Sequence, residues 1–93
     1  MKSEFTNDEV EKVSIFLQTY LGDNKLKFLT ADESATLLAE NGILSNQIGP
    51  KPGFNFRQML RDGRDGLINL VSGAYQERPN TKWYIYKDNS TAG

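Results

Sequence analysis

Three arginines recur at helical spacing within one stretch of the chain. Arg57, Arg61 and Arg64 are separated by four and then three residues, which places them on the same side of a helix. The apolar residues of the stretch fall on another side; they are Phe56, Met59 and Leu60. A guanidinium group can bind a phosphate, or the acceptor edge of guanine, through two parallel hydrogen bonds. The spacing therefore predicts a nucleic-acid contact. The alternative is an ordinary amphipathic helix whose basic side faces water.

Local signals predict where this arginine-bearing helix, within residues 55–64, begins and ends. Asn55 can cap the first turn, and Gln58, three residues later, can reach back to it. Gly63 is suited to a left-handed exit from the helix. We therefore expect helical structure over residues 56–62.

Several other chemistries lack the residues that they need. The chain has no cysteine and no histidine, which excludes disulfides, thiolate or imidazole metal sites and histidine-based catalysis. It contains no glycine-rich phosphate-binding motif. A nuclease needs clustered carboxylates that hold a metal ion, and no such cluster occurs at short spacing. We therefore predict a protein that is not an enzyme and that uses no cofactor and no metal.

Charge is distributed unevenly along the chain, although the net charge is only −1. Residues 50–87 contain seven basic and three acidic residues, whereas residues 1–23 contain two basic and five acidic ones. Local charge, rather than the total, sets the attraction to a phosphate backbone. The basic half supplies the residues that we expect to contact nucleic acid: Lys51, Asn55, Arg57, Gln58, Arg61, Arg64, Arg78 and Lys82.

The elements that must position these residues have clear start signals. A Thr-x-x-Glu capping box at residues 6–9 predicts a helix over residues 7–21. A second box at residues 30–33 opens a helix over residues 31–40. Between them, alternating residues indicate a short strand within 25–29.

The sequence predicts a β-hairpin in the C-terminal part of the chain. Residues 67–75 and 82–87 are rich in branched and aromatic side chains, and residues 76–81 between them contain a Pro-Asn turn signal. The tip of this hairpin, residues 76–82, carries Arg78 and Lys82. The hairpin contains four aromatic residues: Tyr75, Trp83, Tyr84 and Tyr86. Because strand side chains alternate between two sides, these four cannot all face the core.

Ninety-three residues are enough for one small domain with a single core. We expect a folded α+β domain over residues 5–87, with a flexible start at 1–4 and a flexible tail at 88–93. The predicted core consists of Val13, Leu17, Leu38, Phe56, Leu60, Leu70 and Ile85. The chain shows neither a signal peptide nor an apolar run of membrane-spanning length, so we expect a cytoplasmic protein with no membrane partner.

The order of these elements resembles the winged-helix family of helix-turn-helix domains, over residues 5–87. In that family the third helix enters the major groove of DNA, and the hairpin wing touches the backbone or the minor groove. The resemblance implies that the third helix carries Asn55, Arg57, Gln58, Arg61 and Arg64, and that the wing carries Arg78 and Lys82. The family joins its second and third helices by a tight turn, whereas residues 41–53 separate them here.

Residues 52–57, with the sequence Pro-Gly-Phe-Asn-Phe-Arg, also resemble small winged-helix modules that accompany bacterial restriction nucleases. Winged helices serve as protein-interaction modules too, and a fold alone does not decide function. The arginine row and the basic wing favour double-stranded DNA as the partner. An acidic pI of 5.3 and exposed aromatic residues favour the alternative, a non-enzymatic protein-interaction module, inhibitor or adaptor.

Overall fold

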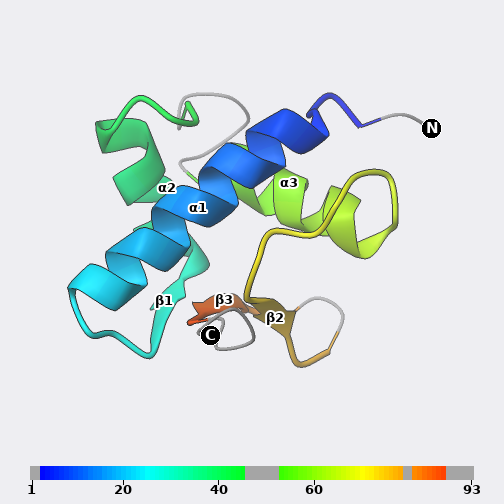
Figure 1. The fold of residues 1–93 in the computed structure, drawn as a ribbon. Coiled ribbons are helices and arrows are strands. Elements are labelled where there is room, and N and C mark those ends of the chain that lie inside the picture. Colours follow the sequence, from blue (N-terminus) through cyan, green and yellow to red (C-terminus); the bar gives the residue numbers. More distant parts are fainter. Residues whose placement is uncertain (1–2, 46–52, 79–80, 88–93) are drawn as a thin grey trace.

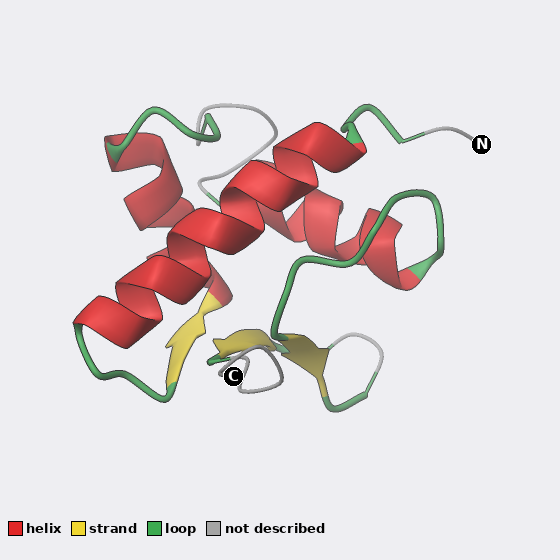
Figure 2. Cartoon of the chain, in the orientation of Figure 1, coloured by secondary structure: helices red, strands yellow, loops and turns green. Residues whose placement is uncertain are grey.

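Three helices and a three-stranded antiparallel sheet form the part of the chain that the computed structural model describes, residues 3–45, 53–78 and 81–87. In chain order the elements are α1 (Asn7–Asp23), β1 (Phe28–Thr30), α2 (Ala31–Glu40), α3 (Phe54–Arg64), β2 (Ala74–Gln76) and β3 (Trp83–Tyr86) (Figure 1). Strand β3 is central, with β1 and β2 antiparallel on either side. The helices lie together on one side of the sheet (Figure 2). The predicted α+β class is therefore confirmed.

Helices α1 and α2 begin where their capping boxes predict. The Thr6 hydroxyl accepts the Glu9 N–H at 3.1 Å, and the Glu9 carboxylate accepts the Thr6 N–H at 2.9 Å. Thr30 and Glu33 make the same reciprocal pair, at 3.1 and 3.0 Å. Each box supplies partners for backbone groups that the helix itself leaves unpaired. Helix α2 has the predicted bounds, and α1 extends two residues beyond Leu21.

The first strand lies later than predicted because a helix end occupies part of the expected range. After α1, Lys25 takes a left-handed conformation with φ 54°. Its N–H donates to Gly22 O at 3.2 Å, and the Leu26 N–H donates to Leu21 O at 2.9 Å. These two bonds form a Schellman motif, which satisfies the last carbonyls of the helix. Strand β1 can therefore begin only at Phe28.

Helix α3 begins at Phe54, before the predicted start, and Asn55 does not cap it. The capping position is held by Gly53, with φ 88° and no side-chain hydrogen bond. Asn55 lies inside the helix, and its Nδ2 donates to Ser45 O at 3.1 Å. A Cβ on Gly53 would stand 2.6 Å from Nη1 of Arg57. The backbone conformation is therefore what favours glycine here, since the Arg57 guanidinium ends a flexible side chain and could move away from an added Cβ.

The predicted exit of α3 at Gly63 is also wrong. Gly63 lies within the helix, where an added Cβ would stand 2.8 Å from the Cα of Leu70. The left-handed exit is Gly66, with φ 82°. Gly63 is thus required by the close approach of the following loop, whereas Gly66 is required by the turn.

Most of the predicted strand over residues 67–75 is a loop, and β2 contains only its last two residues and Gln76. The backbone of this loop pairs with side chains of α1 rather than with a neighbouring strand. Asn69 N–H donates to Asn7 Oδ1 (2.8 Å), Ser72 N–H donates to Ser14 Oγ (3.0 Å), and Gln18 Nε2 donates to Ser72 O (3.1 Å). These bonds satisfy groups that a strand would have paired in a ladder.

The core lies between the helices and the inner side of the sheet. Six predicted core residues are buried: Val13, Leu17, Leu38, Phe56, Leu60 and Ile85. The prediction for Leu70 is wrong, because this side chain is 45% exposed on the loop rather than buried on a strand. Trp83 and Ile85 bring β3 into the same apolar cluster. Within the described ranges, none of the helices combines the length and the apolar character needed to cross a bilayer.

Candidate nucleic-acid interface

The predicted arginine row lies on one side of α3. Residues on this side, which we call the outward side of α3, are half-buried or exposed: Phe54, Arg57, Gln58, Arg61 and Arg64. The opposite side packs into the core through Phe56, Met59 and Leu60. Spacings of three, four and seven residues explain this division, since they return to the same side of a helix.

Arg57 connects α3 to the start of α2. Its Nη1 donates to Oδ1 of Asp32 at 2.8 Å. Asp32 lies in the first turn of α2, where a carboxylate suits the positive end of the helix dipole. Its side chain is 84% exposed, and exposed ion pairs contribute only about 0–1 kcal/mol. The pair orients Arg57, whose own side chain is 22% exposed.

Arg61 is held by a chain of hydrogen bonds along the helix. Its Nη2 donates to Gln58 Oε1 at 2.8 Å, and Gln58 Nε2 donates to Asp62 Oδ1 at 2.8 Å. Asp62 is buried, and its Oδ2 accepts the Ser3 hydroxyl at 2.6 Å. The guanidinium also lies 5.5 Å from the centre of the Phe54 ring, within cation–π distance. Arg61 therefore has a defined position on the outward side.

Arg64 connects the end of α3 to the hairpin. Its Nε donates to Asp65 Oδ1 at 3.2 Å and its Nη1 donates to Gln76 Oε1 at 3.0 Å. Gln76 in turn donates from Nε2 to Thr81 O across the hairpin at 2.9 Å. A hollow of about 400 Å³ lies between helix and hairpin, and its lining includes Gly63, Arg64, Tyr75, Gln76, Arg78 and Trp83.

Both predicted wing cations are exposed. Thr81 closes the turn beside Arg78, because its hydroxyl donates to Arg78 O at 2.6 Å and lies 3.2 Å from the Arg78 N–H. Lys82 follows directly, before β3 begins. Residues 79 and 80 of the predicted turn, the predicted contact Lys51 and the predicted tail over 88–93 lie outside the described residues.

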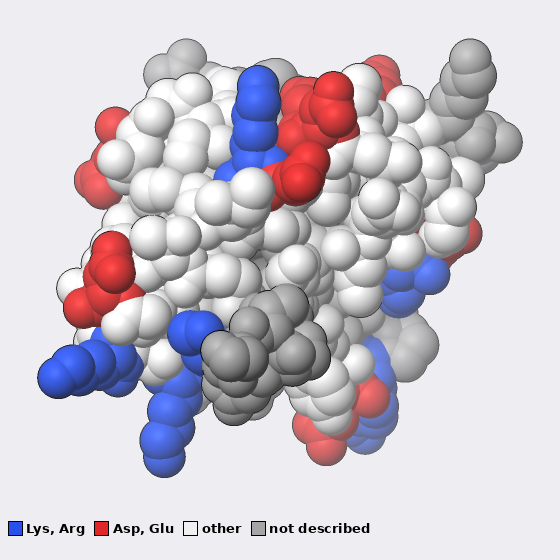
Figure 3. Space-filling view, viewed as in Figure 1, with Lys and Arg blue, Asp and Glu red and all other residues white. Residues whose placement is uncertain are grey.

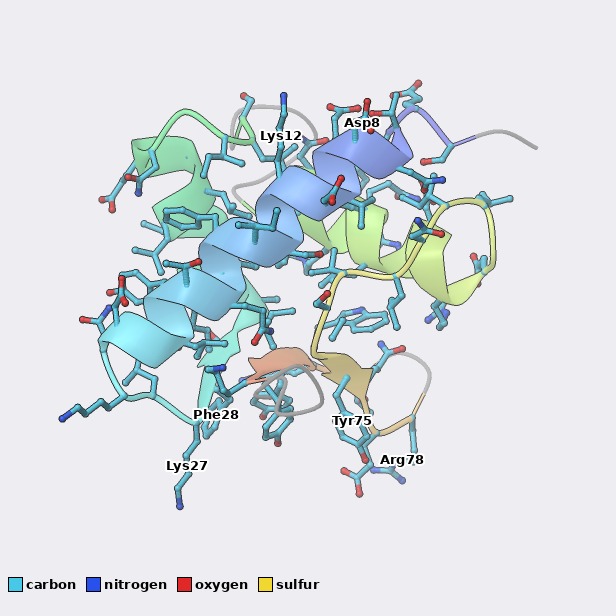
Figure 4. The ribbon with its side chains drawn as sticks, in the orientation of Figure 1. Asp8, Lys12, Lys27, Phe28, Tyr75 and Arg78 are labelled. Atoms are coloured by element: carbon cyan, nitrogen blue, oxygen red, sulfur yellow. The ribbon has the colours of Figure 1, made fainter. Side chains whose placement is uncertain are left out.

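Acidic and basic side chains both occur on the side of the molecule where α1 lies in front. In Figure 3, which shows the side with α1 in front, one group of acidic side chains lies over the first half of α1 beside a basic one, and both signs occur along the margins. Asp8 and Lys12 mark the α1 end in Figure 4, and Lys27 and Arg78 mark the lower margin. The acidic group over α1 thus reflects the acidic start of the sequence, whereas the margins carry both signs.

Comparison with known proteins identifies no relative of this chain. No protein-family model, no curated protein and no solved structure matches this chain.

Asn55 does not share the outward side with the other predicted contacts. It is 7% exposed, and its amide bonds to the backbone of Ser45. Asn55 therefore stabilises the connection between α2 and α3 and is not available on the outward side of α3. Among residues 3–45, 53–78 and 81–87, no group of three acidic side chains has the arrangement of a metal site.

Sequence reasoning missed the partners that orient the arginines. Asp32 is 25 residues from Arg57, and Gln76 is 12 residues from Arg64, so neither partner has a local signal. The Gln58–Asp62 bond is different, because a spacing of four residues on a helix brings such side chains together.

Proposed function

We propose that this chain is a winged-helix domain that binds double-stranded DNA, with α3 in the major groove and the β2–β3 hairpin against the backbone. The observation that carries this proposal is the outward side of α3, which presents three arginines and a glutamine beside the hairpin. The order of helices and strands, on which the resemblance to that family rests, supports the same proposal.

The chemistry of the outward side suits base recognition. Arginine can bind guanine O6 and N7 together, and glutamine can bind adenine N6 and N7. Arg57 and Gln58 lie in the first half of α3, and the first part of a recognition helix usually contacts the base edges. Arg61 is already positioned by Gln58 and Phe54, so less side-chain entropy is lost when it binds.

The remaining cations suit the phosphate backbone. Arg78 and Lys82 lie on either side of the hairpin turn, and Arg64 lies where α3 meets the hairpin. A duplex seated on α3 would bring a phosphate strand close to these three groups. Contacts of this kind add affinity that depends on salt but not on sequence.

A binding titration over a randomised duplex pool, at two salt concentrations, tests the proposal. Arg57→Ala should relax the preference at one base position, at a cost of about 1–3 kcal/mol there. Lys82→Ala should weaken all duplexes alike and lower the salt slope by about one unit. Lys12→Ala is the matched control, because it removes the same charge from α1 (Figure 4).

Two results would contradict the DNA proposal. One is that the wild-type protein binds no duplex at low salt. The other is that Arg57→Ala, Lys82→Ala and Lys12→Ala weaken binding equally, since that would show attraction to net charge without a defined surface.

A groove beside α1 favours a second candidate function, the recognition of a protein. The groove has a volume of about 540 Å³ and lies between α1 and the loop over residues 69–72. Ile15, which is 60% exposed, and Leu70 give it apolar walls, and Asp8 and Glu11 give it negative charge. These properties suit a basic amphipathic peptide. In a screen of such peptides, Ile15→Asp should abolish binding and Arg61→Ala should not.

A further inference from the structure

The outer side of the sheet, which faces away from the helices, carries a continuous group of aromatic rings. Along β3, Trp83 and Ile85 are buried and the residues between and after them point to the other side. Antiparallel pairing places β1 and β2 residues beside them: Phe28 opposite Tyr86, and Tyr75 opposite Tyr84. We call this surface the aromatic face: Phe28, Tyr75, Tyr84 and Tyr86.

The rings of the aromatic face contact one another without a break. Ring centres are 5.6 Å apart for Phe28–Tyr84 and for Phe28–Tyr86, 5.9 Å for Tyr75–Tyr86 and 6.3 Å for Tyr84–Tyr86. Three of these side chains are 41–49% exposed, and Tyr84 is half-buried. The helices cover only the other side of the sheet (Figure 1). Much aromatic surface is thus available for stacking.

Positive charge borders the aromatic face at several points. Lys27 directly precedes Phe28, Arg78 follows β2, and Lys82 precedes β3; all three are exposed. Figure 4 shows Lys27 and Arg78 at opposite ends of the face, extending in the same direction as Phe28 and Tyr75. Glu77 is an exposed acid beside Arg78, and the aromatic face itself contains no charged residue.

We propose that the aromatic face binds single-stranded nucleic acid, with unpaired bases stacked on its rings and phosphates on Lys27, Arg78 and Lys82. Aromatic rings between cations are the recurring solution for binding single strands, because every base has a π face and every nucleotide has a phosphate. A duplex keeps its bases stacked inside the helix and cannot use the rings in this way. The ligand of this face therefore differs from the duplex proposed for α3.

Charge also decides between a single strand and the other possible occupants. A second copy packed on this face would bring Lys27, Arg78 and Lys82 near the same cations of its partner, and like charges repel. An apolar protein surface would leave the bordering cations without partners. A polyanion with planar bases satisfies both the rings and the charges.

Fluorescence anisotropy with labelled oligothymidine and oligouridine, at low and moderate salt, tests this inference. Wild-type protein should bind, and affinity should fall as salt rises. Tyr86→Leu keeps an apolar side chain but removes the ring, so it should weaken binding roughly 5- to 100-fold. Tyr86→Phe should bind as the wild type does. Tyr75→Leu and Tyr75→Phe repeat the comparison at a second position, should the Tyr86 variants fail to fold.

Two control variants distinguish stacking on the aromatic face from binding at other surfaces of the domain. Ile15→Ala removes exposed apolar surface from α1 and should leave single-strand binding unchanged. Arg61→Ala should lower duplex binding and leave single-strand binding unchanged, so failure of one proposal does not imply failure of the other. Equal affinity for the two oligomers supports base stacking alone. Tighter binding of oligouridine would indicate that the protein also contacts the 2′-hydroxyl of RNA.

Three results would overturn the inference. The first is that neither oligomer binds at low salt. The second is that Tyr86→Leu and Tyr75→Leu bind as tightly as the wild type. The third is concentration-dependent self-association that the leucine variants abolish, because it would show that the aromatic face joins two copies of the chain.

Discussion

Gly73 lies where the chain enters the hairpin, and replacing it with alanine should destabilise the domain severely. Its φ is 80°, and an added Cβ would overlap Tyr86 O. The left-handed conformation costs alanine about 1–2 kcal/mol. The overlap cannot be relieved by turning a side chain, because the Tyr86 oxygen belongs to the backbone and the Tyr86 N–H donates to Gly73 O at 2.8 Å. Overpacking of this kind adds about 1–3 kcal/mol.

The sum, about 2–5 kcal/mol, is a large part of the roughly 5–15 kcal/mol typical of small domains. Gly66→Ala is a matched control: its φ is 82°, and an added Cβ would meet nothing within 4 Å. It should therefore cost only the conformational part, about 1–2 kcal/mol. Urea unfolding followed by circular dichroism measures both variants, and the slope of free energy against urea should not change.

The difference between the two glycine variants isolates the overlap with Tyr86. If Gly73→Ala loses no more stability than Gly66→Ala, the close approach between Gly73 and Tyr86 is refuted. The close packing of the backbone where the chain enters the hairpin would then be wrong as well.

Three further predictions concern other parts of the fold. Leu60→Ala, at a fully buried site on α3, should cost about 2–5 kcal/mol in urea unfolding. Leu70→Ala, on the exposed loop, should cost about 0.5 kcal/mol, and equal losses would contradict the burial of Leu60 in the core. Lys25→Gly should raise the unfolding free energy by about 0.5–1 kcal/mol, because it relieves a left-handed conformation; a lower melting temperature would contradict this. Asp32→Asn should change stability by less than about 1 kcal/mol and tighten duplex binding in the salt titration, since it removes an acid beside Arg57; weaker duplex binding would count against the role of α3.

Local signals predicted the starts of α1 and α2 but not the ends of α3, and distant partners limited the prediction of the sheet. A capping box needs only residues three apart, so the starts of α1 and α2 could be read directly. The loop over residues 67–73 looks like a strand in composition. Its backbone is paired instead with Asn7, Ser14 and Gln18, which are 54 to 62 residues away. A local sequence pattern cannot predict a partner that is so far away in the sequence.

In the candidate site, too, local spacing was predictable and distant partners were not. Helical spacing predicted that Arg57, Arg61 and Arg64 share one side, and the structure confirms this. The groups that orient two of them, Asp32 and Gln76, come from other elements and could not be predicted from spacing. The DNA contacts themselves stay predictions that the titration tests.

The side-chain amide of Gln18 has a consequence for the order in which the chain folds. Its Nε2 donates to Ser72 O at 3.1 Å and to Tyr86 O at 2.9 Å, so one group of α1 joins both sides of the hairpin entrance. Contacts that span 54 and 68 residues form only after a large loop has closed, and such contacts slow folding. The helices can form early from local signals, whereas the hairpin acquires its final geometry when α1 docks against it. We therefore expect the last two strands to become stable only when α1 docks against them.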